Sequence, residues 1–123
     1  MTILNRSLAL LPGETVLWHG PAMKLPEVGL SIGGTLYMTN ERLAFVPNRL
    51  RSAKRFWSSP SSEIMSTGVE GPLGVPYKSM IHSIVVVHLF RDEAVRFRTS
   101  DSEKTAPLLN SLLRNGDVGG DAP

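Results

Sequence analysis

The densest run of charged side chains is basic and spans residues 48–55, where the sequence reads Asn-Arg-Leu-Arg-Ser-Ala-Lys-Arg. Its cations are Arg49, Arg51, Lys54 and Arg55. A guanidinium pairs with a phosphate through two hydrogen bonds, and a lysine adds a point charge. Each basic group near an anionic membrane contributes about 1 kcal/mol of attraction. The run therefore predicts contact with an anionic surface, and the alternative is a solvated loop that is basic by composition alone.

The histidines do not predict a metal site. His82 and His88 share one face of an expected strand, but their separation of six residues corresponds to about 20 Å. That distance is too long for two ligands of one metal ion, and His19 lies far away in the sequence. We therefore expect half-buried strand histidines and no bound metal.

The usual nucleophiles and phosphate loops are also missing. The serines of residues 58–62 stand in no Gly-x-Ser-x-Gly elbow, and the chain has no cysteine. Gly33 and Gly34 are not followed by the Gly, Lys and Thr of a phosphate-binding loop. We expect these glycines to allow a strand to bend or another backbone to approach closely. We expect no enzymatic activity and no cofactor.

Length and charge narrow the class of protein further. The chain has 123 residues and a formal net charge of +2, which fits one domain and does not indicate a nucleic-acid binder. The longest apolar run, from Ile84 to Phe90, is interrupted by His88 and is far shorter than a membrane-spanning helix. The N-terminus lacks the features of a signal peptide. We expect a cytoplasmic protein whose contact with a membrane is peripheral.

Short segments with alternating apolar side chains dominate the first hundred residues. They predict strands near residues 14–20, 35–39, 43–46, 56–57, 63–69, 80–90 and 93–99. Gly20-Pro21 is expected to be a turn, and residues 22–32 a loop. Alternation places four side chains in the core, namely Leu36, Met38, Leu43 and Phe45.

The pattern changes to a helical period after residue 99. Ser100 and Glu103 have the spacing of a capping box, and Leu108, Leu109, Leu112 and Leu113 form an apolar stripe. Pro107 implies either a kink or a start near Thr105, and Gly116 is the expected end. We therefore predict one domain over residues 1–116 and a disordered tail over residues 117–123.

Two blocks of sequence resemble a known family. They are Leu11 to Ala22, reading LPGETVLWHGPA, and Gly33 to Phe45, reading GGTLYMTNERLAF, and weaker matches follow at residues 57–64 and 96–99. Over roughly residues 11–114 the chain is similar to the GRAM domain of the pleckstrin-homology superfold, in its stand-alone bacterial type. The resemblance implies a mainly β fold: a PH-like seven-stranded antiparallel barrel or sandwich of two orthogonal sheets, capped by one C-terminal α-helix.

The resemblance also implies a binding module rather than an enzyme. GRAM domains are associated with phosphoinositides, with other anionic lipids and with protein partners. In the superfold, the loop between the third and fourth strands opens at the same end as the first-to-second and sixth-to-seventh loops. The predicted lipid or anion site therefore gathers six cations, namely Lys24, Arg49, Arg51, Lys54, Arg55 and Arg91.

The second strand qualifies this prediction. Phosphoinositide-binding relatives carry basic residues there, whereas Gly33 to Thr39 has none, so non-specific attraction to anionic lipid is favoured over an inositol-phosphate pocket. We expect a non-enzymatic module that attaches weakly and peripherally to phosphoinositide or another anionic phospholipid. The alternative is a protein-interaction module that uses a sheet edge or the groove beside the C-terminal helix.

Overall fold

The computed structural model describes residues 8–26, 31–48, 56–70 and 84–121, with side chains as far as Arg114. Its elements are β1 (Val16–Leu25), β2 (Ile32–Thr39), β3 (Arg42–Pro47), β4 (Trp57–Pro60), the 3-10 turn η2 (Ser61–Glu63), β5 (Ile64–Glu70), β6 (Ile84–Leu89), β7 (Glu93–Thr99) and α1 (Ser102–Asp121). The prediction of a mainly β chain with seven antiparallel strands and one C-terminal helix is confirmed.

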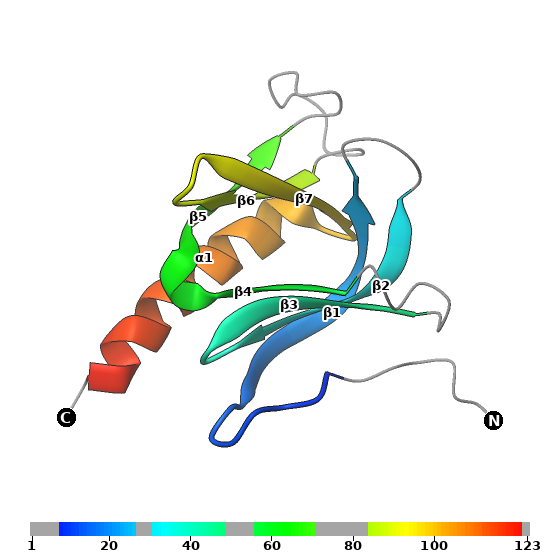
Figure 1. Ribbon diagram of the computed structural model, residues 1–123. Helices are drawn as coiled ribbons and strands as arrows, with labels where there is room; N and C mark the ends of the chain where they lie inside the picture. The colour runs from blue at the N-terminus through cyan, green and yellow to red at the C-terminus, as the bar shows by residue number, and fades with distance from the viewer. Residues whose placement is uncertain (1–7, 27–30, 49–55, 71–83, 122–123) are drawn as a thin grey trace.

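The strands form one continuous antiparallel sheet in the order β4-β3-β2-β1-β7-β6-β5. β1 joins its two halves, because it pairs with β2 from Val16 to Lys24 and with β7 from Ala22 to Leu25. The two expected sheets are therefore halves of a single sheet that share β1. Figure 1 shows α1 running between the half made of β5–β7 and the half made of β1–β4.

β1 is longer than the sequence predicts. The expected turn at Gly20-Pro21 is wrong, and so is the loop assigned to residues 22–25, because the strand continues to Leu25. Pro21 has no N–H to donate, but pairing with β7 begins only at Ala22, so Pro21 has one strand neighbour. A proline is tolerated in such an edge-like position.

The start of α1 also differs from the prediction. Asp101, not Ser100, caps the helix: its Oδ1 accepts a hydrogen bond from the Lys104 N–H at 3.3 Å. The helix therefore begins at Ser102, ahead of Pro107, and it extends to Asp121, past the expected end at Gly116. The division of the chain into a domain and a tail at residue 116 stays a prediction.

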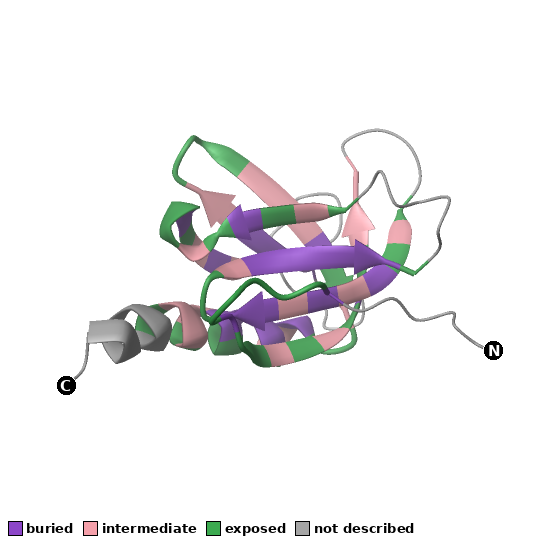
Figure 2. Ribbon diagram, turned by 60° about the horizontal axis from the view of Figure 1, so that its bottom comes forward, coloured by how far each residue is buried: buried purple, intermediate pink, exposed green. Residues whose placement is uncertain are grey.

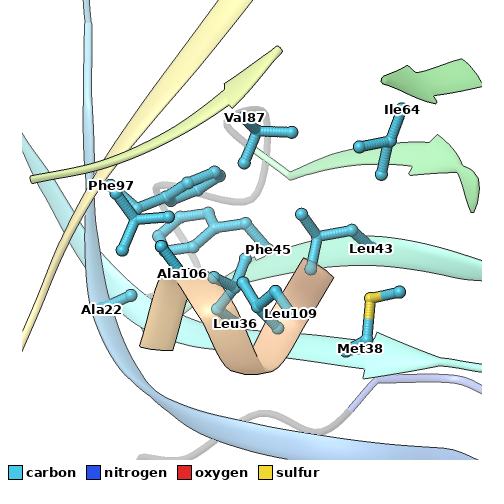
Figure 3. Packing of buried hydrophobic residues seen from close by; sticks show 11 residues of the cluster. Ala22, Leu36, Met38, Leu43, Phe45, Ile64, Val87, Phe97, Ala106 and Leu109 are labelled. Carbon is cyan, nitrogen blue, oxygen red and sulfur yellow. The ribbon is translucent and has the colours of Figure 1, made fainter. Parts of the chain in front are cut away.

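The core lies between the two halves of the sheet and α1 (Figure 3). All four predicted core residues are buried, namely Leu36, Met38, Leu43 and Phe45. The Phe97 ring lies 5.8 Å from that of Phe45 and 5.6 Å from that of Trp57, between centroids, so β3, β4 and β7 meet there. Such tilted aromatic pairs add stability beyond the area they bury.

The leucine stripe of α1 is confirmed for three of its four residues. Leu109 is fully buried, and Leu112 and Leu113 pack against the core, whereas Leu108 is exposed. The stripe therefore follows the side of the helix that faces the sheet, and Leu108 lies outside it.

α1 also protects the outer edge of β5. The Asn110 side-chain amide accepts a hydrogen bond from the Thr67 N–H at 2.8 Å and donates one to the Thr67 carbonyl at 2.7 Å. The Thr67 hydroxyl donates to the Ala106 carbonyl at 2.6 Å. A side chain thus takes the place of a neighbouring strand and satisfies polar groups that an edge would otherwise expose.

β3 is buried along nearly its whole length, from Leu43 to Pro47 (Figure 2). Its inner face contributes to the core, and on its outer face Ala44 and Val46 pack with Leu8 of the N-terminal segment. Gly34, opposite Pro47, allows the close approach expected at the glycine pair. A Cβ there would collide with the Val46 carbonyl oxygen and lie 2.7 Å from the Phe45 ring.

We expect Gly34→Ala to destabilise the fold by about 1–3 kcal/mol, the usual cost of overpacking. Gly33→Ala is the matched control, since the nearest neighbour of the added Cβ would be the side-chain nitrogen of Asn48 at 3.9 Å. That variant should stay within about 0.5 kcal/mol of the wild type in urea unfolding. Equal losses for the two variants would contradict the close approach at Gly34.

Candidate functional site

Lys24 lies near the end of β1, on the face of the strand that looks toward the core. It shares that face with the buried Ala22, and its register partners are Ile32 of β2 and Phe97 of β7. Lys24 is half-buried, and it lies one residue before the end of β1.

The basic run begins at this same end of the sheet. β3 ends at Pro47, opposite Gly34, and the Asn48 N–H donates to the Gly33 carbonyl at 3.1 Å. Gly33 pairs with Met23, the neighbour of Lys24. The four predicted cations Arg49, Arg51, Lys54 and Arg55 lie outside the described residues. The structure therefore fixes the position of Asn48, the residue just before Arg49, beside Gly33, which is one register step from Lys24.

A further cation near this end was not part of the predicted site. Arg98 lies opposite Met23 on the outer face of β7 and is exposed. Its neighbour on that face, Arg96, is held by Glu70 through an Nε–Oε1 contact of 3.0 Å. The pairing of β7 with β1 brings the backbone of Arg98 within one register step of Lys24, although the two side chains leave opposite faces of the sheet.

Arg91 lies at the opposite end of the molecule. Its turn is tied to η2 by a hydrogen bond from the Phe90 N–H to the Glu63 carbonyl at 3.1 Å. η2 in turn is tied to the β2–β3 turn, because the Ser61 N–H donates to the Glu41 carbonyl at 2.9 Å. In Figure 1 the β6–β7 turn lies at the left and the end of β1 at the upper right.

The length of β2 separates these two ends. Ile32, the partner of Lys24, is seven residues from Thr39, which corresponds to about 23 Å of extended chain. The structure therefore does not bring Arg91 to Lys24. The expectation that the sixth-to-seventh loop opens at the same end came from the superfold, and the described hydrogen bonds place that turn elsewhere.

The most highly organised polar cluster lies around Glu14, whose side chain is fully buried. Its carboxylate accepts hydrogen bonds from the Arg42 Nε at 2.8 Å and from the Thr39 hydroxyl at 2.6 Å. It also accepts the Leu11 N–H at 2.8 Å, and Arg42 donates to the Ala9 carbonyl at 2.9 Å. The cluster therefore binds the N-terminal segment to the β2–β3 turn.

This cluster explains much of the motif on which the family resemblance rests. Asn40 accepts the Thr15 N–H at 2.8 Å and donates to the Gly13 carbonyl at 3.2 Å. Gly13 has φ +79°, which glycine adopts without strain. The polar residues of the β2–β3 turn thus form a structural clamp with the N-terminal segment, and the Glu14 carboxylate oxygens already accept hydrogen bonds from internal donors.

The Arg42 guanidinium lowers the pKa of Glu14 from 4.5 to about 2, against the opposing effect of desolvation. The Thr39 hydroxyl and the Leu11 N–H favour the ionised form as well. A carboxylate held ionised in this way is a poor general acid or base near neutral pH. We therefore assign Glu14 a role in stability and not in catalysis.

The histidines lie apart from one another. His19 is exposed and stacks on Tyr37 at 5.7 Å between ring centroids, and His88 lies opposite Ala94 of β7. His82 lies outside the described residues. In the part of the chain that the structure describes, no three His, Cys, Asp or Glu side chains come together as a metal site. The absence of a bound metal stays a prediction.

Comparison with known proteins supports the fold alone. No family model matches this chain, and no curated protein matches its sequence. The C-terminal domain of an unknown protein from Leishmania infantum has a similar structure, with a TM-score of 0.64 and 19% identity over 83% of this chain and 86% of its own. The Vps36 N-terminal PH domain matches with a TM-score of 0.64 and 12% identity over 87% and 84% of the two chains.

The third similar structure is the complex of the PDZ-RhoGEF DH/PH domains with GTP-gamma-S activated RhoA. It matches with a TM-score of 0.56 and 9% identity, over 86% of this chain and 31% of the other. At these identities the likeness establishes a PH-like fold and leaves the ligand open.

We expect the Glu14 carboxylate to make stability depend on pH. Its folded pKa of about 2 lies below the ordinary 4.5, so its contribution is complete above about pH 4.5 and is lost as the pH falls toward 2. The difference in unfolding free energy between the wild type and Glu14→Gln should therefore shrink over that range. Glu41→Gln is the control, because it removes an exposed carboxyl from the adjoining β2–β3 turn. A difference that stays constant with pH would contradict the assignment.

Proposed function

We propose that this chain is a GRAM-type, non-enzymatic binding module that attaches weakly to anionic membrane lipid at the Lys24 end of the sheet. One observation supports the proposal most directly. The Asn48 N–H donates to the Gly33 carbonyl, and Gly33 pairs with Met23, so the residue that precedes Arg49 lies close to Lys24. The PH-like fold of the similar structures is consistent with a module of this kind. A stand-alone protein of bacterial type that is cytoplasmic and peripheral at the membrane is part of the same proposal.

The expected attraction is the sum of several small terms. The described cations at this end are Lys24, Arg98 and Arg96, of which Arg96 is paired with Glu70, and the run adds Arg49, Arg51, Lys54 and Arg55. At about 1 kcal/mol for each cation, such a set supports reversible peripheral binding. β2 carries no cation between Ile32 and Thr39, so the contact is with anionic phospholipid in general and not with one inositol phosphate.

Apolar side chains at the same end would add to this contact. Met23 and Phe56 are exposed by 38% and 44%, and Phe56 is the first described residue after the basic run. Exposed apolar groups beside cations are typical of surfaces that lie in a membrane interface. Neither helical segment of the described chain has the length and apolar character needed to cross a bilayer.

The second candidate, a protein-interaction module, is favoured by one edge of the sheet. Asn110 and Ala106 already occupy the β5 edge at Thr67, so an added strand fits better at β4. β4 is the other edge strand, and it carries no charged residue between Trp57 and Pro60. Capture of one specific partner that survives loss of the basic run would favour this candidate.

We expect the protein to sediment with phosphatidylserine-containing vesicles and not with neutral ones, and the binding to weaken as salt rises. Lys24→Glu should weaken it clearly, by roughly the effect of two charges. Replacing Arg49, Arg51, Lys54 and Arg55 by Glu together should abolish it.

The matched control is Arg91→Glu, which makes the same change of net charge at the opposite end of the molecule. It should leave vesicle binding nearly unchanged. Binding that is absent on anionic vesicles, or that falls equally in Lys24→Glu and Arg91→Glu, would refute the proposed orientation.

A further inference from the structure

The end of the molecule that carries Arg91 contains a pocket of about 400 Å³. Its walls come from η2, from the end of β6 and from the β6–β7 turn, and its lining is Ser62, Glu63, Leu89, Phe90, Arg91 and Glu93. The hydrogen bond from the Phe90 N–H to the Glu63 carbonyl fixes the turn against η2. Leu89 pairs with both Ile64 and Glu93, so the walls belong to the ordered sheet.

Two apolar side chains shape the pocket. Leu89 is half-buried, and its packing against the core fixes its position as the apolar floor of the pocket. Phe90 is exposed by 63%, the largest exposure among the large apolar side chains of the described residues. An aromatic ring at the rim of a pocket offers its face to an alkyl chain or to a cation.

The charge of the lining is negative on balance. Glu63 and Glu93 contribute carboxylates from separate elements, and Arg91 is the one cation among the six lining residues. Among the described residues, these three make no ion pair or side-chain hydrogen bond, whereas the Glu14 and Glu70 carboxylates are both paired with arginines. Unpaired carboxylates beside an apolar base are complementary to a cation on an apolar stem.

We propose that this pocket binds an arginine side chain presented by a partner protein. The stem would lie on Leu89, the planar guanidinium would stack on Phe90, and its hydrogen-bond donors would reach Glu63 and Glu93. Arginine fits better than lysine because only a planar group can stack and donate to two carboxylates at once. The pocket is a second binding site, at the end opposite to the proposed membrane contact.

Arg91 competes with this ligand in the proposal. Its guanidinium shares the pocket with the two carboxylates, although no contact within 4 Å joins them in the described structure. Removing its charge should therefore leave binding of an arginine side chain unchanged or tighter. A pocket that bound anions through Arg91 would show the opposite result.

The test is an NMR titration of the full chain with N-acetyl-arginine methylamide. The control ligand is N-acetyl-citrulline methylamide, which has nearly the same shape and no charge. We expect saturable shifts of the amides of residues 62–63 and 89–93, with a dissociation constant in the millimolar range for the arginine compound. The citrulline compound should bind at least about fivefold more weakly, a loss of about 1 kcal/mol.

The variants separate the proposal from general charge attraction. Glu63→Gln and Glu93→Gln should each weaken arginine binding by about fivefold, whereas Glu41→Gln in the nearby β2–β3 turn should not. All three side chains are exposed, so an unchanged amide spectrum of each free variant shows that its fold is intact. Equal binding of the two ligands, shifts away from the pocket, or a loss on Arg91→Gln would overturn the proposal.

Discussion

The buried ion pair between Glu14 and Arg42 is the interaction on which the arrangement of the N-terminal half depends. Removing one partner of such a pair leaves an uncompensated buried charge, at a cost of about 3–5 kcal/mol. Here the donors around the carboxylate come from two segments: Leu11 belongs to the N-terminal segment, and Thr39 and Arg42 flank the β2–β3 turn. The pair therefore holds the N-terminal segment against the β2–β3 turn, and that segment covers the outer face of β3 with Leu8.

β1 is the second constraint, since it belongs to both halves of the sheet. Its pairing with β2 and β7 joins the two halves of the sheet around the core, and the two ends of the molecule carry different charged residues. Lys24 and Arg98 lie near one end, and the carboxylates of Glu63 and Glu93 lie at the other. A protein held to an anionic surface by the first end would present the second to a partner, so the two proposals are compatible in one orientation.

Local patterns predicted much of the fold and less of the site. Alternation identified Leu36, Met38, Leu43 and Phe45 as core because a strand with one buried face has a period of two residues. The same reasoning failed at Gly20-Pro21, where turn-forming residues lie within β1, since the position of β7 makes a proline tolerable there. It also failed to predict the pocket, whose lining residues come from segments about thirty positions apart in the chain.

By itself the sequence determined the strand periodicity, the C-terminal leucine stripe and the concentration of cations after Pro47. These features depend on residue type and on neighbours a few positions away. Only the tertiary structure decided which ends of strands coincide, because that follows from the register of β1 with β2 and β7 and from the hydrogen bonds of η2. For that reason Arg98 lies near Lys24, and Arg91 lies with Glu63 and Glu93 at the far end of the sheet.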